Sequence, residues 1–267
     1  MIRKGYTDGP FGQIHWRMME PQGDATQPDL YCMHPGPFSG IAYTNIMPNL
    51  AHNRRVIAPD YPGYGGSDPF KEHPSIAEYA LAMFAVAGDL TGKAQIDLTG
   101  FHTGNLVAGE MAVSKPSSIH KLALVDAPAF DAETSAKYRS MAAQPFEISE
   151  DKDSLEKPWK RGISSRISEQ GPARALEMFA EQLRAGRNMH TAFDAAFTYD
   201  VYGRLPKITH ACLVLATQSE LLEATRWAGE NIPNAKLLER LDIDKGVLDQ
   251  YAETTASEIL KFLDGAD

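Results

Sequence analysis

The stretch QIDLTGFHTGNL, residues 95–106, decides the fold. Its first half is a short apolar run, which predicts a buried strand, and its second half continues into NLVAGEMAV, which predicts a helix. Between the two, Gly100 and Gly104 stand two residues on either side of His102. Glycines at this spacing allow a sharp turn from a strand into a helix. The sequence therefore predicts that His102 is presented at the tip of that turn.

Short strand-like runs alternate with longer helical runs along most of the chain. This alternation predicts an α/β fold, in which helices cover both faces of a mostly parallel central sheet. Two antiparallel strands are expected through about residue 20. The other expected strands are 30–33, 55–58, 95–99, 121–125, 211–216 and 235–241. The expected helices are 41–50, 76–90 with a capping box formed by Ser75 and Glu78, 103–114, 220–231 and 250–263.

The region from about residue 130 to 205 has a different texture. It begins with a charged, irregular stretch, then shows helical periodicity over residues 172–197, and it contains no strand-like run. These features predict a helical insertion that covers the sheet. The expected division is a core made of residues 1–130 and 206–267 and a helical cap made of residues 131–205.

Composition excludes several classes of partner. Of the 267 residues, 43% are hydrophobic and 23% are charged, the formal net charge is −9, and no run rich in lysine and arginine occurs. Nucleic acids and anionic membranes need basic patches, so neither is expected as a partner. No signal-peptide core and no membrane-spanning apolar run is evident, and a cytoplasmic protein is expected. Cys32 and Cys212 lie in apolar stretches and are interpreted as buried thiols.

Four segments, taken in chain order, resemble the α/β-hydrolase superfamily. YCMHPGP (31–37) resembles the HG-x-P segment that helps to build the oxyanion hole, and RRVIAPDYPGYGGSD (54–68) resembles the D-x-P-G-x-G-x-S segment, in which Asp60 and Ser67 are expected to fix a turn. GFHTG (100–104) resembles the nucleophile elbow G-x-S-x-G, with histidine in place of serine. The helical insertion stands where these enzymes carry a cap. The resemblance covers almost the whole chain and implies the α/β-hydrolase fold.

The resemblance also implies where a catalytic triad would lie, and this chain departs from it. In the superfamily the triad follows the chain order nucleophile, acid, histidine. No histidine follows His210, so the usual C-terminal catalytic histidine is absent. Counting back from the last helix puts Lys245 at its place, with Asp244 or Asp242 as alternatives. The acid position, after the strand CLVLAT, offers Glu220.

The apparent catalytic set is therefore His102, Glu220 and Lys245. Asp126, at the end of another strand, is an alternative acid, although a turn-fixing role is favoured for it. For Lys245, a salt bridge with Glu220 is favoured over direct binding of a substrate carboxylate or enolate by its ammonium group.

His102 stands at a helix N-terminus, where the macrodipole disfavours a cation, so its pKa is expected to be lowered. A neutral imidazole can act as a general base or attack an acyl carbon. The role of general base is favoured because no proton-relay partner is evident, and Glu220 is available to orient the ring. The alternative is that His102 belongs to a site that no longer turns over any substrate.

Two backbone groups are the candidate oxyanion-hole donors. Thr103 is interpreted as one donor and not as a nucleophile, because a β-branched residue tolerates the positive φ of an elbow badly. Gly36 is the other, since the proline before it has no N–H. The candidate substrate-binding residues are His34, Phe38 and Trp159. For His34, a structural role with bonds to the backbone is favoured.

Three functions are compatible with these residues. The favoured one is a cofactor-independent enzyme that hydrolyses an ester, a lactone or a C–C bond in a small carbonyl compound. The second is a lyase, decarboxylase or isomerase, which needs a base and an enolate-stabilising hole but no acyl-enzyme. The third is a catalytically silent protein that binds a small ligand. No metal-ligand spacing or nucleotide motif is present, so no metal or cofactor is expected; a small-molecule substrate is the expected partner, and a homo-oligomer stays open.

Overall fold

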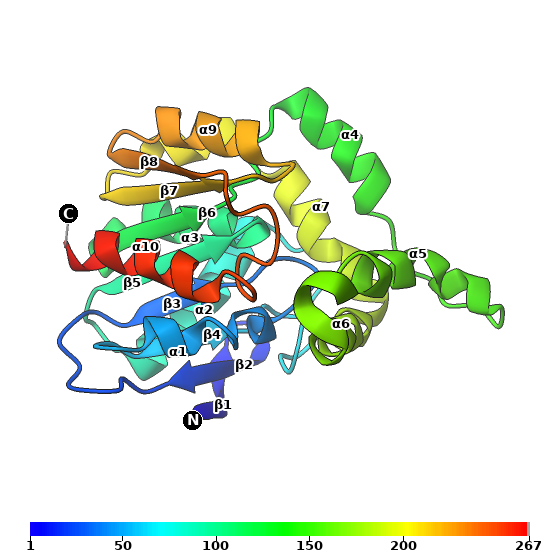
Figure 1. The fold of residues 1–267 in the computed structure, drawn as a ribbon, viewed down its shortest axis with the longest axis horizontal. Coiled ribbons are helices and arrows are strands. Elements are labelled where there is room, and N and C mark those ends of the chain that lie inside the picture. The colour runs from blue at the N-terminus through cyan, green and yellow to red at the C-terminus, as the bar shows by residue number, and fades with distance from the viewer. Residues whose placement is uncertain (266–267) are drawn as a thin grey trace.

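The computed structural model describes residues 1–265, and one mixed sheet organises them (Figure 1). The first two strands pair antiparallel with each other and β2 pairs antiparallel with β4, whereas every later pair is parallel. The order across the sheet is β1 (Ile2–Gly9), β2 (Gly12–Met19), β4 (Val56–Pro59), β3 (Leu30–Met33), β5 (Ile96–Phe101), β6 (Ile119–Val125), β7 (Cys212–Thr217) and β8 (Ala235–Arg240). The predicted mostly parallel sheet is confirmed.

Helices cover both faces of this sheet. The α-helices are α1 (Met47–Leu50), α2 (Ile76–Leu90), α3 (Thr103–Ser114), α4 (Ala132–Ala142), α5 (Glu156–Trp159), α6 (Ile167–Arg184), α7 (Thr191–Thr198), α8 (Val201–Arg204), α9 (Leu222–Asn231) and α10 (Ala252–Asp264). On one face, α2 and α3 share a buried apolar cluster with the strands, and on the other face α1 and α10 do so. Successive strand residues belong to opposite clusters, as in β7, where Val214 packs on the α3 side and Leu215 on the α10 side. The strands are buried on both faces, which explains their continuous apolar sequence.

Most predicted elements match the structure to within one or two residues at each end. The capping box of α2 is present, because Ser75 Oγ accepts from the Glu78 N–H and a Glu78 carboxylate oxygen accepts from the Ser75 N–H at 2.9 Å. The single helix predicted for residues 41–50 is wrong. The chain instead forms a 3₁₀ turn, Gly40–Tyr43, and then the short α1. Pro48 lacks an N–H and its ring clashes with the preceding turn, so one continuous helix is disfavoured there.

The chain between β6 and β7 carries α4 to α8 and contains no strand, so the predicted helical insertion is confirmed. In Figure 1 this insertion lies beyond the end of the sheet at which β5 and β6 end. Helix α6 is interrupted at Gly171, whose φ of 75° is not helical, and Pro172 follows it. The separation into a core and a cap at residues 130 and 205 stays a prediction.

The predictions about the two cysteines are confirmed, because Cys32 and Cys212 are buried free thiols in β3 and β7. Burial raises the pKa of both thiols far above its ordinary value. Among the helices formed by residues 1–265, none combines the length and the apolar character that crossing a membrane requires.

Candidate active site

His102 stands at a strained turn between β5 and α3. Its φ is 52° and its ψ is −121°, a conformation that non-glycine residues rarely adopt. The flanking glycines are required by close contacts. A Cβ on Gly104 would lie 1.9 Å from the Met33 carbonyl oxygen, and one on Gly100 would lie 2.6 Å from the Asn105 nitrogen. The predicted sharp turn with His102 at its tip is therefore confirmed.

Asn105 ties this turn to the neighbouring strand, a feature that the sequence did not suggest. Its side-chain amide donates to the Val125 carbonyl oxygen at 2.7 Å, and its side-chain oxygen accepts from the Val125 N–H at 3.0 Å. Because Val125 is the last residue of β6, both bonds hold the start of α3 against the sheet. The close contacts of the flanking glycines and the hydrogen bonds of Asn105 together hold the backbone of His102 in its strained conformation.

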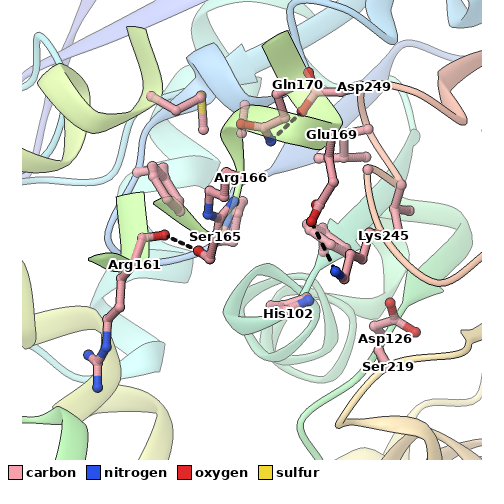
Figure 2. A pocket seen from close by; sticks show the side chains of 18 of the residues that line it. His102, Asp126, Arg161, Ser165, Arg166, Glu169, Gln170, Ser219, Lys245 and Asp249 are labelled. Carbon is pink, nitrogen blue, oxygen red and sulfur yellow. Dashed lines mark hydrogen bonds and ion pairs between the residues drawn. The ribbon is translucent and has the colours of Figure 1, made fainter. Parts of the chain in front are cut away.

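A cavity of about 500 Å³ opens over His102 (Figure 2). The core contributes the loop after β3, residues 35–38, together with residues at the ends of β6 and β7. The insertion contributes side chains from residues 161–182, and the segment before α10 contributes residues 244–249. Three separate parts of the chain therefore meet at His102.

The imidazole of His102 is a neutral group at pH 7. The side chain is half-buried, and burial together with the nearby positive charge of Arg166 lowers its pKa to about 4. The predicted direction is confirmed, but burial is the largest cause and the charge of Arg166 adds to it. In the described part of the chain, no group forms a hydrogen bond with the ring, which packs against Phe101 with centroids 4.1 Å apart. Its lone pair is therefore available to a substrate or a water.

Gly36, which lines the cavity, packs against Thr103, the residue that follows His102 at the start of α3. A Cβ built on Gly36 would lie 3.6 Å from Thr103 Oγ1 and 2.8 Å from Ala192 Cβ, so a side chain at Gly36 would not fit. Over residues 1–265, no protein oxygen accepts a hydrogen bond from either N–H. Two unused donors therefore stand next to a neutral imidazole.

Comparison with known proteins agrees with this geometry. The model of the α/β-hydrolase fold family matches residues 30–162, which span β3, the elbow and the beginning of the insertion. A hydrolase from Pseudomonas aeruginosa superimposes on 98% of this chain and 98% of its own length, with a TM-score of 0.80 at 17% identity. The chain has the α/β-hydrolase fold. The enol-lactonase of Burkholderia xenovorans is also similar, with a TM-score of 0.78 at 16% identity over 97% of this chain and 100% of its own.

Sequence similarity to curated proteins is confined to a shorter part. The pimeloyl-[acyl-carrier protein] methyl ester esterase of Aeromonas hydrophila is 35% identical over 98 residues, which are 37% of this chain and 37% of that esterase. The match therefore spans little more than a third of the relative's length. Like the match to the family model, it agrees with the α/β-hydrolase fold of this chain.

In this α/β-hydrolase fold, the carboxyl group that reaches the cavity is Asp126 and not Glu220. Asp126 directly follows β6 with a φ of 50°, is almost fully buried, and accepts hydrogen bonds from the Thr217 N–H at 2.9 Å and the Thr217 hydroxyl at 2.7 Å. Burial raises the pKa of its carboxyl group, although the bonds from Thr217 oppose this. Glu220 is exposed and outside the cavity lining, because the chain turns outward after Ser219. Asp126 thus both fixes a turn and lines the cavity.

Lys245 lines the cavity, but its expected salt bridge with Glu220 is wrong. Its ammonium nitrogen lies 3.1 Å from a carboxylate oxygen of Glu169, which comes from α6. The Lys245 side chain is 61% exposed, so this position is a rim and not a buried triad site. Of the two alternatives, Asp244 also lines the cavity, whereas Asp242 binds Arg240.

Two of the three candidate substrate-binding residues lie outside the cavity lining, and the structural role favoured for His34 is confirmed. His34 is fully buried below the cavity; its Nδ1 donates to the Pro35 carbonyl at 3.0 Å and its Nε2 accepts from the Tyr61 N–H at 3.0 Å. Burial lowers the pKa of His34 to about 4, so the ring is a neutral structural element. Trp159 is 51% exposed and packs edge-on against Phe179, outside the cavity. Only Phe38 lines the cavity.

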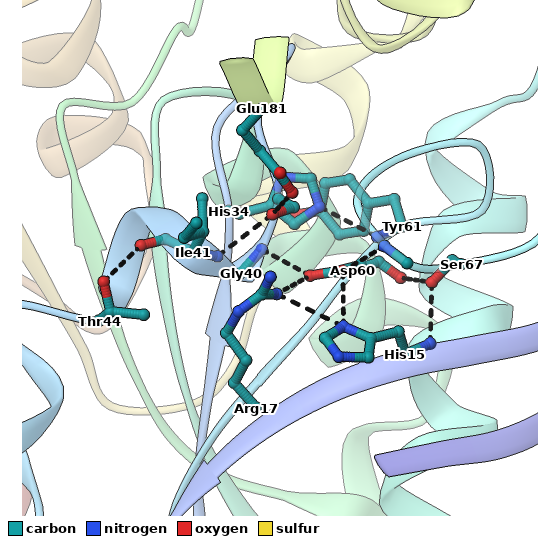
Figure 3. A network of polar contacts seen from close by, with 12 residues as sticks. His15, Arg17, His34, Gly40, Ile41, Thr44, Asp60, Tyr61, Ser67 and Glu181 are labelled. Carbon is teal, nitrogen blue, oxygen red and sulfur yellow. Dashed lines mark hydrogen bonds and ion pairs between the residues drawn. The ribbon is translucent and has the colours of Figure 1, made fainter. Parts of the chain in front are cut away.

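A buried polar network supports the loop that carries His34 (Figure 3). The Asp60 carboxylate accepts from the backbone N–H groups of Gly40 at 2.8 Å and Gly66 at 2.9 Å, and from His15 at 2.8 Å. The Ser67 hydroxyl donates to the Asp60 carbonyl at 2.8 Å and accepts from the His15 N–H at 3.0 Å. The turn-fixing role predicted for Asp60 and Ser67 is confirmed.

The sequence missed the cavity residues that the insertion supplies. Among them are Arg161, Ser165, Arg166 and Gln170. The guanidinium of Arg166 lies 5.3 Å from the centre of the Phe38 ring, and in the view of Figure 2 His102 lies between Arg166 on one side and Asp126 on the other. No local pattern marks these residues, since their position depends on how α6 packs over the sheet. Residues 1–265 contain no cluster of three or more histidine, cysteine or acidic side chains that could hold a metal ion.

Proposed function

We propose that this protein is a cofactor-independent enzyme that hydrolyses an ester, lactone or C–C bond in a small carbonyl compound, with His102 as its general base. The observation that carries the proposal is a neutral imidazole on a strained elbow, facing a cavity and lying next to two unused backbone donors. Such strain persists where the surrounding structure enforces it, and it clusters at functional sites. The esterase relative and the lactonase of the same fold support a hydrolytic activity.

The proposed reaction uses one water. His102 takes a proton from the water while the water oxygen attacks the carbonyl carbon of the substrate. The N–H groups of Gly36 and Thr103 donate hydrogen bonds to the oxyanion that forms. When the tetrahedral intermediate collapses, the carbon–oxygen bond to the leaving group breaks. The leaving alkoxide then takes the proton from the His102 imidazolium. Atoms and charges balance without a second proton relay.

The role of base suits His102 better than the role of nucleophile. In a Ser-His-Asp triad the nucleophile gives its proton to a neighbouring base, and no such partner bonds to His102 in residues 1–265. Glu220 has no part in this proposal because it lies outside the cavity. Asp126 takes its place as the nearby carboxyl group and positions the ends of β6 and β7, while Lys245 and Glu169 form the rim.

A second candidate function is a lyase, decarboxylase or isomerase at the same site. The absence of a serine at the elbow favours it, since enolate chemistry needs a base and an oxyanion hole but no acyl-enzyme. The two candidates differ in the substrates they accept. β-Keto acids would be consumed by a decarboxylase, whereas activated esters and lactones would be consumed by a hydrolase.

The test compares wild type with His102→Ala on short-chain p-nitrophenyl esters, lactones and β-keto acids. We expect wild type to hydrolyse an ester or lactone and the variant to lose about 10²- to 10⁴-fold in kcat/KM. His52→Ala, at an exposed histidine outside the cavity, is the matched control and should keep full activity. Circular dichroism checks folding of all three proteins. Equal rates for wild type and H102A would overturn the proposal, and turnover of β-keto acids alone would favour the second candidate.

A further inference from the structure

Arg166 is a cation without a counterion in the wall of the cavity. It immediately precedes α6, is half-buried and lines the cavity over His102. In the described residues, no carboxylate lies within ion-pair distance of its guanidinium, and the group donates no hydrogen bond. Its guanidinium instead lies over the face of the Phe38 ring.

The carboxylates nearest to Arg166 are already used by other cations. Glu169 pairs with Lys245 at 3.1 Å, and Asp249 pairs with Arg174 at 2.9 Å. Asp249 also accepts from the Gln170 side chain at 2.8 Å. Burial lowers the pKa of Arg166, whereas the charges of Glu169 and Asp249 oppose this. A partly buried and unpaired charge costs free energy, and a bound anion would offset that cost.

Arg166 also faces the reacting group. Both side chains line the same cavity and the charge of Arg166 lowers the pKa of His102, so an anion bound to the guanidinium would share the cavity with the base. A cavity of about 500 Å³ is large enough for a small molecule that carries both a carbonyl group and an acid group. The planar guanidinium fits a carboxylate through two parallel hydrogen bonds.

We propose that Arg166 binds a carboxylate of the substrate, so that the enzyme acts on small carbonyl compounds that carry a second, anionic group. Half-esters of dicarboxylic acids and lactones with a carboxylate substituent belong to this class. The proposal rests on the function proposed above, because it names the substrate class of that same site. In this proposal the insertion recognises the substrate through Arg166, and the elbow carries out the reaction through His102.

The proposal has a consequence for the base. A carboxylate on Arg166 offsets the charge that helps to hold the pKa of His102 low, so the bound substrate makes His102 a stronger base than it is in the free enzyme. The other charged groups in the cavity lining are Asp126, Arg161, Glu169, Asp244, Lys245 and Asp249. Of the charges in the cavity lining, that of Arg166 is the one that lowers the pKa of His102.

The test measures binding without turnover. Succinate, which cannot be hydrolysed, and its neutral diamide succinamide are titrated calorimetrically into wild type, Arg166→Gln and Arg184→Gln. Arg184 lies on the same helix, is exposed and is outside the cavity, so R184Q matches the change in charge. We expect wild type and R184Q to bind succinate at least tenfold more tightly than R166Q does. Succinamide should bind all three proteins equally.

A second readout follows His102 by nuclear magnetic resonance, with H102A used to assign its signal. Saturating succinate should raise the pKa of His102 by at least half a unit in wild type and leave it unchanged in R166Q. Arg166→Lys keeps the charge without the planar group and should bind succinate with intermediate affinity, which guards against a folding defect in R166Q. Equal affinity of wild type and folded R166Q for succinate would overturn the proposal, whatever esters are hydrolysed. Succinate binding that depends on Arg166, in a protein that hydrolyses no ester or lactone, would support the anion site and contradict the proposed function.

Discussion

The two walls of the cavity are built in opposite ways. On the core side, His34 and Asp60 lie below the cavity with every polar atom bonded to the backbone or to a buried partner, and Asp126 is held by Thr217. On the insertion side, Arg166 carries a free charge and Glu169 is held by one exposed lysine. The polar groups of the core wall therefore find their partners within the protein, whereas in the described residues Arg166 of the insertion wall has no counterion. This difference is what the proposed function and the proposed carboxylate site require, with the chemistry on the first wall and the selectivity on the second.

The largest effect on stability is expected from Asp60→Asn in the core wall. Burial by itself would raise the pKa of Asp60, but the bonds from His15 and Gly66 and the charge of Arg17 lower it, so the group is a carboxylate. Losing its charge leaves Arg17, which donates to it at 2.6 Å, buried without a counterion. We expect the free energy of unfolding to fall by about 3–5 kcal/mol in urea denaturation.

Asp24→Asn, at an exposed aspartate, is the control and should change stability by less than about 0.5 kcal/mol. A loss of similar size in D24N and D60N would mean that the network below the cavity does not support the core wall. The comparison of the two walls would then fail at its rigid side.

The contrast between the walls also explains what the sequence could predict. Strands such as β3 and β7 were predictable because they are buried on both faces and leave an apolar run between turn residues. The elbow was predictable because Gly100 and Gly104 are required by local contacts. Gly36 and His102 lie just after the ends of two parallel strands, β3 and β5. Because the ends of parallel strands lie at the same edge of a sheet, the sequence could place these two residues near one another.

The insertion wall was not predictable for a physical reason. Arg166 reaches the cavity only because α6 packs over the end of the sheet, and nothing within a few residues of it encodes that packing. The sequence also placed Glu220 in the site, for a related reason. The direction of the chain after β7 decides which side chain points into the cavity, and that residue is Ser219 and not Glu220. Lys245 was placed at the right loop but was given the wrong partner, because Glu169 arrives from the insertion.

Acid should reveal the rigidity of the core wall. His34 has a pKa of about 4 in the folded protein and about 6.5 when unfolded, so below pH 6.5 the unfolded state takes up a proton that the folded state does not. Stability should therefore fall as the pH drops from about 6.5 to 4, by about 3 kcal/mol from this residue. The measurement is urea denaturation at half-unit steps of pH.

The variant that isolates this effect is His34→Asn, which cannot titrate. It should be less stable than wild type at pH 7, and its stability should fall less steeply between pH 6.5 and 4. Carboxylates titrate at the lower end of this range in both proteins, so the difference between the two slopes is the quantity to compare. Identical slopes of stability against pH for the two proteins would show that His34 is protonated in the folded protein, so that this part of the core wall tolerates a buried positive charge.

The smallest effect is expected from Lys245→Met on the insertion side. The Lys245 side chain is 61% exposed in its pair with Glu169, so solvent screens its ammonium group, and screened ion pairs contribute about 1 kcal/mol or less. We expect a change in stability of less than about 1 kcal/mol and a change in kcat/KM of no more than about threefold, since Lys245 touches only the rim. Lys261→Met is the matched control, because Lys261 is 55% exposed and pairs with Glu258 at 3.6 Å on α10, away from the cavity. Should K245M instead lose tenfold or more in kcat while K261M does not, Lys245 would belong to the catalytic set with His102, and the rim of the insertion wall would take part in the chemistry.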